Sequence, residues 1–306
     1  MNLYRKHLWI IGPRVVALQQ ALLLAASWFS TMRRVGYPSS DLAGNPHVLR
    51  DDPDCRSEAN RERRRIGVPA DQEHVVFSFS DPQYYRQHLS PDMERYHAPR
   101  NSDLGALLQP LRDLRARGLS VVRVGIVGSD LATTPIEGLV RDVQLGRSEK
   151  GEMALIARAR FGWTDASGAW WAWTALGLPI LLTSAFSLRF RFALPKNLIY
   201  LPNMYRRSDG SDLTFGQMLA GTNKLSRRLA FQGQRVERVM PSARHITAAF
   251  DEVLTLPRSR TAERVESDEV RELRERLAKV FLRANQPPNV GMASQFLIDH
   301  AHLIDD

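Results

Sequence analysis

An uncharged stretch from Ala166 to Leu188 constrains most strongly what this chain can fold into. A transmembrane helix needs about 20 predominantly apolar residues, so this stretch is long enough to cross a bilayer. Its interior, however, contains Gly168, Gly177 and Pro179. A spanning helix tolerates glycine and proline only where neighbouring groups satisfy the freed backbone. These three residues therefore favour a stretch that is divided into shorter elements.

The divided stretch fits a helix followed by a buried strand. Asp165 or Ser167 can cap a helix over residues 166–176. Residues 178–183, LPILLT, follow a glycine turn and are typical of a strand. Strands of a parallel sheet are covered on both faces and are continuous apolar runs for that reason. The stretch predicts half of an α/β unit in a globular protein, with its tryptophans packing the helix against a sheet.

Strands and helices alternate along the chain from residue 74. β-Branched and aromatic runs predict strands, and apolar residues at helical spacing predict helices. The expected strands are 74–79, 120–125, 160–163 and 178–183, with an edge strand at 235–239, and the expected helices are 104–114, 153–159, 166–176, 242–254, 263–285 and 292–303. This alternation predicts an α/β fold with a doubly wound, mostly parallel sheet, across which the last helix docks.

Composition divides the chain into three parts. Residues 1–70 form an N-terminal helical and linker segment, 71–257 carry the sheet, and 258–306 carry charged C-terminal helices. The first helix is amphipathic and is expected to pack on the domain, with an anionic inner leaflet as the alternative. The arginine-rich run 61–65 is expected to be a solvated face, because no nucleic-acid motif accompanies it.

The formal net charge is +9, and the excess is mostly arginine. This suggests an anionic partner, and composition leaves nucleic acid, lipid headgroups and a phosphorylated substrate open. Cys55 is the only cysteine, which excludes an intramolecular disulfide and a cysteine-based zinc site and fits a cytoplasmic location. Asp52 and Asp54 have a spacing that can hold a metal ion, but they lie in a turn-rich segment, so no metal is expected there.

Polar residues follow the expected strands where ligands of parallel sheets bind. These residues are Ser80, Asp81, Gly125, Thr164, Asp165, Ser167, Gly168, Thr183 and Ser184. The pair Ser167 and Gly168 is the sharpest candidate, because small residues before a helix let backbone amides approach a diphosphate. The sequence contains no glycine-rich dinucleotide fingerprint, phosphate loop, nucleophile elbow or paired-histidine zinc motif.

Several segments, taken in order, resemble a bacterial family of glycosyltransferases of GT-B-like fold that is often associated with surface polysaccharide synthesis. The resemblance covers roughly residues 60 to 304 and rests on the order of several weak motifs. They are RRIGVPADQEHVVFSFSDPQYY (64–85), HAPRNSDLGALLQPLRDLRARGLSVVRVG (97–125), RSEKGEMALIARARFGWTDASG (147–168), LPKNLIYLP (194–202), LTFGQML (213–219) and FLIDHAHLI (296–304).

The resemblance implies a metal-independent, cofactor-free transferase that moves a sugar from a nucleotide-sugar donor to a glycan or lipid-linked acceptor. Residues 71–257 would be a Rossmann-like donor-binding domain, the nucleotide-binding half of a GT-B-like fold. The implied donor-binding residues are Ser167, Gly168, Arg123, Gly125, Arg100, Asp165 and Ser184. Asp81 is the implied general base on the acceptor side, with His97 second. For each of these side chains, a loop contact or a surface ion pair is the alternative.

Two departures from the family pattern leave other functions open. Ser80 stands where the family has an arginine, and residues 1–70 are shorter than an acceptor-side domain. A non-catalytic nucleotide-sugar-binding or scaffold protein is one alternative. A peripheral membrane or nucleic-acid-binding protein that uses the basic front is another, with nucleic acid the less favoured partner. The expected location is the cytoplasm, with peripheral contact to the inner membrane as an option.

Overall fold

The structure is a computed structural model. It describes residues 51–79, 104–125, 140–142, 148–165, 170, 173–174, 176–185, 188, 197–228, 230–231, 234–257, 264–286 and 291–304.

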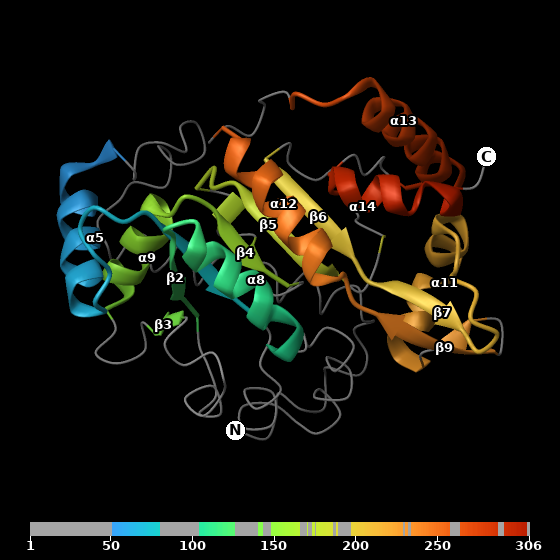
Figure 1. Ribbon diagram of the computed structural model, residues 1–306, viewed down its shortest axis with the longest axis horizontal. Helices are drawn as coiled ribbons and strands as arrows, with labels where there is room; N and C mark the ends of the chain where they lie inside the picture. Colours follow the sequence, from blue (N-terminus) through green and yellow to red (C-terminus); the bar gives the residue numbers. More distant parts are fainter. Residues whose placement is uncertain are drawn as a thin grey trace, which may run out of the picture.

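A six-stranded parallel sheet forms the centre of the fold (Figure 1). Its strands are β1 (His74–Ser78), β2 (Ser120–Arg123), β3 (Val140–Asp142), β4 (Gly162–Thr164), β5 (Ile180–Ala185) and β6 (Leu198–Pro202). Their order is β3-β2-β1-β4-β5-β6, and every neighbouring pair is parallel. The predicted doubly wound parallel sheet is confirmed. The short β3 and the apolar β6 were not among the strands expected from periodicity.

The strand register shows which side chains face each side of the sheet. Phe77 is level with Arg123 on β2 and with Trp163 on β4. The Trp163 ring contacts Phe250 edge to face, with centroids 5.1 Å apart. Gly162, the preceding residue on β4, faces the other side because side chains alternate along a strand. A Cβ atom at Gly162 would overlap the Trp173 ring, so this tryptophan packs directly on the sheet.

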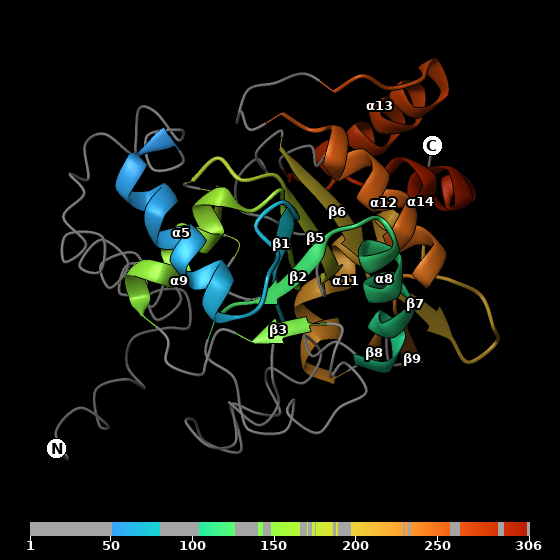
Figure 2. The ribbon, with the colours of Figure 1, turned by 60° about the vertical axis from the view of Figure 1, so that its left-hand side comes forward.

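Helices cover both faces of the sheet (Figure 2). Helices α8 (Leu104–Ala116) and α12 (Ala243–Thr255) lie on one face, and α9 (Glu149–Arg158) and α5 (Pro53–Arg65) lie on the other. Helix α8 begins at Leu104, so Pro110 lies inside the helix and not at its first turn.

The acidic and basic residues of segment 52–65 cap helix α5 and form ion pairs within it. Asp52 caps the helix by accepting a hydrogen bond from the Cys55 amide at 2.7 Å, which is an ordinary N-cap contact. Arg61 and Arg65 pair with Glu58 and Glu62 one turn earlier. The arginine-rich run 61–65 therefore forms the end of this helix, with Arg61, Arg64 and Arg65 exposed and Glu62 buried.

A second, antiparallel sheet follows the first. It consists of β7 (Met204–Arg207), β9 (Gln234–Val239) and β8 (Ala230–Phe231), in the order β7-β9-β8. Helix α11 (Phe215–Arg228) lies between β7 and β8 in the chain. Residues 235–239 were expected as an edge strand of the parallel sheet, and this was wrong. Asn203 separates β6 from β7, and the redirected chain pairs with β9 instead.

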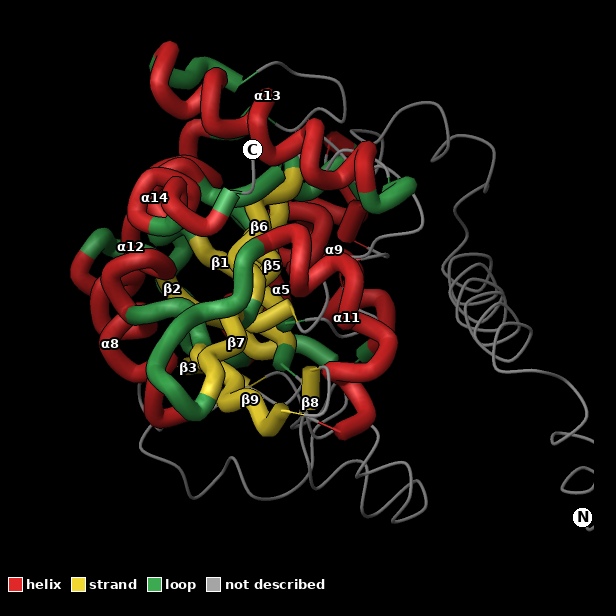
Figure 3. Tube along the Cα trace, turned by 90° about the vertical axis from the view of Figure 1, so that its right-hand side faces the viewer, coloured by secondary structure: helices red, strands yellow, loops and turns green. Residues whose placement is uncertain are grey.

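The C-terminal helices pack mainly on other helices: α14 (Ser294–Asp299) packs on α12, and α13 (Asp268–Arg283) packs on α14 and α11. These helices and the 3-10 turn η3 (Ala301–Leu303), which follows α14, lie at one end of the molecule (Figure 3). Glu252 on α12 accepts hydrogen bonds from the Ser294 amide at 2.6 Å and its hydroxyl at 3.0 Å. Just before α14, Met292 contacts the sheet through an isolated parallel β-bridge to Tyr200 of β6. The expected docking of the last helix is thus made mainly through other helices.

The uncharged stretch of the sequence contains a turn and a strand. Gly177 has a positive φ of 63° and turns the chain into β5. The side chains of Ile180, Leu181 and Leu182 on that strand are fully buried. Among the described residues, no helix combines the length and the hydropathy that crossing a bilayer requires.

Candidate functional site

The strand order reverses between β1 and β4, and this reversal locates the candidate site. From β1 the chain winds outward to β2 and β3, then crosses to β4 and continues to β5 and β6. Helix α8 follows β1 and joins α12 on one face through a 2.6 Å hydrogen bond from Thr247 to Asp113. Trp173 follows β4 and packs on the opposite face, against Gly162. Connections that leave to opposite faces open a crevice at the carboxyl ends of β1 and β4, where such folds bind ligands.

The described polar residues predicted from the sequence lie along this carboxyl edge. Arg123 ends β2, Asp165 directly follows β4, and Ser184 lies near the end of β5. All three are buried, with Asp165 and Ser184 at 0% exposure and Arg123 at 6%. Charged and polar groups are rarely buried this deeply unless they are paired or functional. The fold therefore gathers an arginine, a carboxylate and a hydroxyl at one edge of the sheet.

Gly125, also at this edge, is held by the protein itself. Its φ is +99°, a conformation that favours glycine. Its amide donates a 2.8 Å hydrogen bond to Oε1 of Glu152 on α9. The family resemblance implies Gly125 as a donor-binding residue, and that role stays a prediction. The hydrogen bond to Glu152 engages the amide within the protein and links β2 to α9.

The N-terminus of α9 is surrounded by carboxylates. Ser148 caps the helix by accepting from the Gly151 amide at 2.8 Å. The buried Glu58 of α5 lies 3.5 Å from the Ser148 hydroxyl, and Glu62 is so close that a Cβ atom on Gly151 would overlap its side chain. Glu152 occupies the first turn of α9 itself. Acidic groups complement the helix dipole here and make this terminus a poor place for a phosphate.

Ser184 holds an unusual backbone conformation. Its φ is +54°, in the left-handed region that β-carbon sterics disfavour, and the register of β5 against β6 shifts at this point. Asn203, which follows β6, donates a hydrogen bond from Nδ2 to the Ser184 carbonyl at 3.0 Å. Among the described residues, Ser184 Oγ and Asn203 Oδ1 are buried without a hydrogen-bond partner. Strain and unsatisfied polar groups together are typical of binding sites.

Asn203 was missed by the sequence reasoning. The signal was a polar residue placed directly after the apolar run LIYLP, the same pattern that identified the ends of the other strands. Five other predicted site residues lie outside the described residues: Asp81, His97, Arg100, Ser167 and Gly168. Their roles stay predictions, as do those of Arg123, Asp165 and Ser184.

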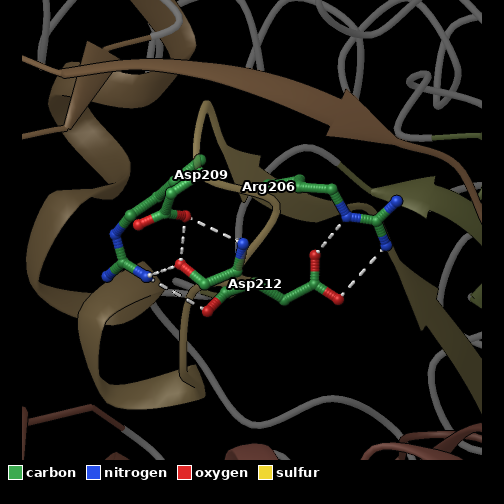
Figure 4. Close-up of polar contacts among 5 residues, drawn as sticks. Arg206, Asp209 and Asp212 are labelled. Carbon is green, nitrogen blue, oxygen red and sulfur yellow. Dashed lines mark hydrogen bonds and ion pairs between the residues drawn. The ribbon is translucent and has the colours of Figure 1, made fainter.

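A second polar cluster lies in the turn after β7 (Figure 4). Arg206 binds Asp212 through two contacts, Nε to Oδ1 at 2.9 Å and Nη2 to Oδ2 at 3.3 Å. Asp209 accepts from the Ser211 hydroxyl at 2.6 Å and from its amide at 2.9 Å. The hydrogen bond from the Ser211 hydroxyl is the main reason why the pKa of Asp209 lies below its ordinary value. These contacts stay within one exposed turn and define its shape.

Comparison with known proteins gives little. No protein-family model and no curated protein matches the sequence. Among solved structures, that of the wall teichoic acid polymerase TagF aligns with 45% of this chain and 31% of its own, at 14% identity and a TM-score of 0.30. The chain therefore spans less than a third of that protein. Similarity this low carries no argument, so the strand order and the side chains at the carboxyl edge are the basis for function.

Proposed function

We propose that this chain is a glycosyltransferase that moves a sugar from a nucleotide-sugar donor to a hydroxyl of a glycan or lipid-linked acceptor. The strand order β3-β2-β1-β4-β5-β6 carries the proposal, because its reversal is the position at which doubly wound sheets bind nucleotides. The resemblance of residues 60 to 304 to GT-B-like transferases supports the choice of reaction. The positive net charge suits an anionic donor.

The donor diphosphate would bind at the crevice rather than at α9. Two connections leave the crevice, one toward α8 and one after β4, where Ser167 and Gly168 stand. Backbone amides at a helix start favour phosphate, whereas the start of α9 is occupied by glutamates. Arg123 and Arg100 would balance the diphosphate charge. Asp165 and Ser184 would orient the donor from the ends of β4 and β5.

The reaction would be a substitution at the anomeric carbon. An acceptor oxygen forms a bond to that carbon, the bond to the diphosphate oxygen breaks, and the acceptor proton passes to Asp81, with His97 as the alternative base. Positioning of the two substrates and stabilisation of the departing diphosphate would supply most of the rate. The proposal assigns no metal and no cofactor. It places the enzyme in the cytoplasm, with an acceptor that could lie at the inner membrane surface.

A panel of nucleotide sugars, tested by thermal shift, examines the proposal. A donor that binds only the folded state raises the melting temperature as its occupancy increases. We expect one nucleotide sugar at millimolar concentration to do so, and Gly168→Asp to abolish the shift through charge repulsion. Gly210→Asp is the matched control, because Gly210 has open space around it and lies in the exposed turn after β7.

Two results would argue against the proposal in different ways. Absence of a shift with every nucleotide sugar and nucleoside diphosphate would contradict a donor site. A shift without donor hydrolysis or sugar transfer would instead support the non-catalytic binding protein. Removing residues 1–50, which keeps α5 and its buried residues, then tests the membrane alternative: loss of binding to anionic vesicles with intact donor binding would place the membrane contact in that segment.

A further inference from the structure

A serine, a histidine and an aspartate are bonded in series at the start of α12. Ser242 Oγ lies 3.0 Å from His245 Nδ1, and His245 Nε2 lies 2.9 Å from Asp299 Oδ2. Asp299 belongs to α14, so only the packing of α14 on α12 brings it to the histidine. Ser242 is exposed, while 14% of the His245 side chain is accessible. A hydroxyl, an imidazole and a carboxylate in this order are the groups that activate serine nucleophiles.

The hydrogen bonds set the protonation of the imidazole. The hydrogen bond from His245 holds the pKa of the Asp299 carboxyl below its ordinary value, so this group is an ionised acceptor at neutral pH. Nε2 of His245 therefore carries the proton, and the lone pair of Nδ1 faces the Ser242 hydroxyl. Gln295 donates to the other carboxylate oxygen at 2.8 Å, and the Phe296 ring packs edge to face on the imidazole at 5.1 Å. These contacts keep the base oriented.

We infer that Ser242 is an activated nucleophile with His245 as its base and Asp299 as a positioning residue, and that this second site cleaves carboxylic esters. The inference is independent of glycosyl transfer. The first amide groups of an α-helix have no partner within the helix, and those of Ala243 and Arg244 lie beside Ser242. They can stabilise the oxyanion that forms when the serine attacks a carbonyl.

The proposed reaction balances with water as the co-reactant. Ser242 Oγ forms a bond to the ester carbonyl carbon while its proton passes to His245 Nδ1. The bond to the alcohol oxygen then breaks, and the alcohol leaves with that proton. Water attacks the acyl-serine and gives a proton to Nδ1, which returns it to the serine oxygen as the acid departs. His245 thus acts as base and as acid in each half of the cycle.

A second capping serine shows what capping alone requires. Ser242 Oγ accepts from the His245 amide at 3.3 Å, and Ser267 Oγ accepts from the Val270 amide of α13 at the same 3.3 Å. Both serines therefore cap a helix, but the residue at the third position is histidine in one and valine in the other. The imidazole is not needed for the cap. Ser267 is a matched control within the chain for a serine without a base.

A fluorophosphonate probe on the full chain tests the inference, with the modified peptides identified by mass spectrometry. We expect modification of Ser242 and not of Ser267. Ser242→Asn should abolish it while preserving the cap. His245→Gln should slow it about 100-fold or more, because a general base is lost. Asp299→Asn should slow it as well by favouring the other tautomer. Cleavage of p-nitrophenyl acetate should follow the same order across these variants.

Three results would overturn the inference: no modification of Ser242, equal modification of Ser267, or an unchanged rate in a folded His245→Gln protein. If that variant does not fold, the pH dependence of the wild type decides instead. Acidification should slow labelling, because a protonated imidazole cannot accept the serine proton. The charged and titratable groups that face this system are Asp299 and His300 from the α14 segment and Arg244 on α12 itself. A rate that does not fall in acid contradicts the inference.

Discussion

The two edges of the parallel sheet use the left-handed backbone conformation differently. At the amino edge, Gly118 and Gly177 adopt positive φ just before β2 and β5. Glycine does so without steric cost. At the carboxyl edge, glycine serves the same purpose at Gly125, but Ser184 also adopts a positive φ, of +54°, near the end of β5. This conformation is unfavourable for serine because of its Cβ atom. The carboxyl edge therefore contains backbone strain that the amino edge avoids.

Polar side chains at the amino edge mostly bind the chain itself. His74 Nε2 lies 2.9 Å from the Leu155 carbonyl oxygen, and Ser120 donates to Gln72 at 2.7 Å. Asn197 donates to the Leu178 carbonyl at 2.9 Å, although its Oδ1 has no partner among the described residues. Buried unsatisfied oxygens therefore occur at both edges. The backbone strain at Ser184 and the buried Asp165 distinguish the carboxyl edge. The amino edge therefore serves the stability of the fold, and the carboxyl edge is suited to a ligand.

The largest effect is expected at the start of β4. Gly162→Ala places a methyl group against the rigid Trp173 ring, and it should lower the free energy of unfolding by about 1–3 kcal/mol. Gly210→Ala is the control, because an added Cβ there meets no atom within 4 Å and the positive φ of Gly210 is the only source of cost. Urea unfolding measures both. Equal losses in the two variants would contradict the close packing of Trp173 on the sheet.

A smaller effect is expected from the left-handed glycine before β2. Gly118→Ala meets no atom within 4 Å, so its cost of about 1 kcal/mol comes from the positive φ alone. Nucleotide affinity should not change, because this glycine lies at the opposite edge. Thermal unfolding with and without the best donor tests both statements. A weaker affinity in a folded variant would mean that the amino edge contributes to the site.

The reverse substitution at the carboxyl edge should separate stability from binding. Ser184→Gly relieves the positive φ and should raise the free energy of unfolding by up to about 1 kcal/mol. The lost hydroxyl should weaken donor binding about fivefold, the value of one hydrogen bond. Asn285→Gly is the control, since Asn285 has a similar φ of 52° in another part of the fold. If binding is unchanged in Ser184→Gly, the serine is no part of the donor site.

The stability of the fold is expected to depend on pH through Glu252, which lies near the C-terminal end of α12 and binds Ser294. Burial is the main cause that raises the pKa of Glu252 above its ordinary value. A raised pKa in the folded state contributes stability that is complete below the unfolded pKa and is lost as pH rises through the folded pKa. As the pH is lowered, the free energy of unfolding of the wild type should therefore increase relative to that of Glu252→Gln. Parallel pH profiles of the two proteins would contradict this.

The smallest effect is expected in the turn after β7, away from both edges. Asp212→Asn weakens the exposed ion pair with Arg206 (Figure 4). Exposed ion pairs contribute little, because water and salt screen them. We expect the melting temperature and the donor affinity to equal those of the wild type. A clear loss of either would show that this turn supports the site.

Local pattern predicted much of the fold but not all of it. The strand near 74–79 was predicted from its β-branched and aromatic residues, and the strand near 178–183 because burial on both faces requires a continuous apolar run. β3 spans only Val140–Asp142, too short for a periodic signal. The pairing of β9 with β7 depends on the redirection of the chain at Asn203, which no pattern within residues 235–239 encodes.

The candidate site divides in the same way. Asp165 and Ser184 were predicted because polar residues that follow apolar strands must meet at one edge of a parallel sheet, whereas Arg123 was implied by the family resemblance. The engagement of the Gly125 amide by Glu152 was not predicted, since it requires α9 to pack beside β2. The approach of Asp299 to His245 likewise depends on how α14 packs on α12.

The sequence by itself determined the α/β class, the division of the uncharged stretch and the residues that end three strands. These features depend on spacing along the chain, and hydrophobic burial acts on that spacing directly. Only the tertiary structure decided the strand order, the reversal between β1 and β4, the strained φ of Ser184 and the series Ser242, His245 and Asp299. Each of these depends on contacts between residues that are distant in sequence, and their energies arise only when the elements pack together.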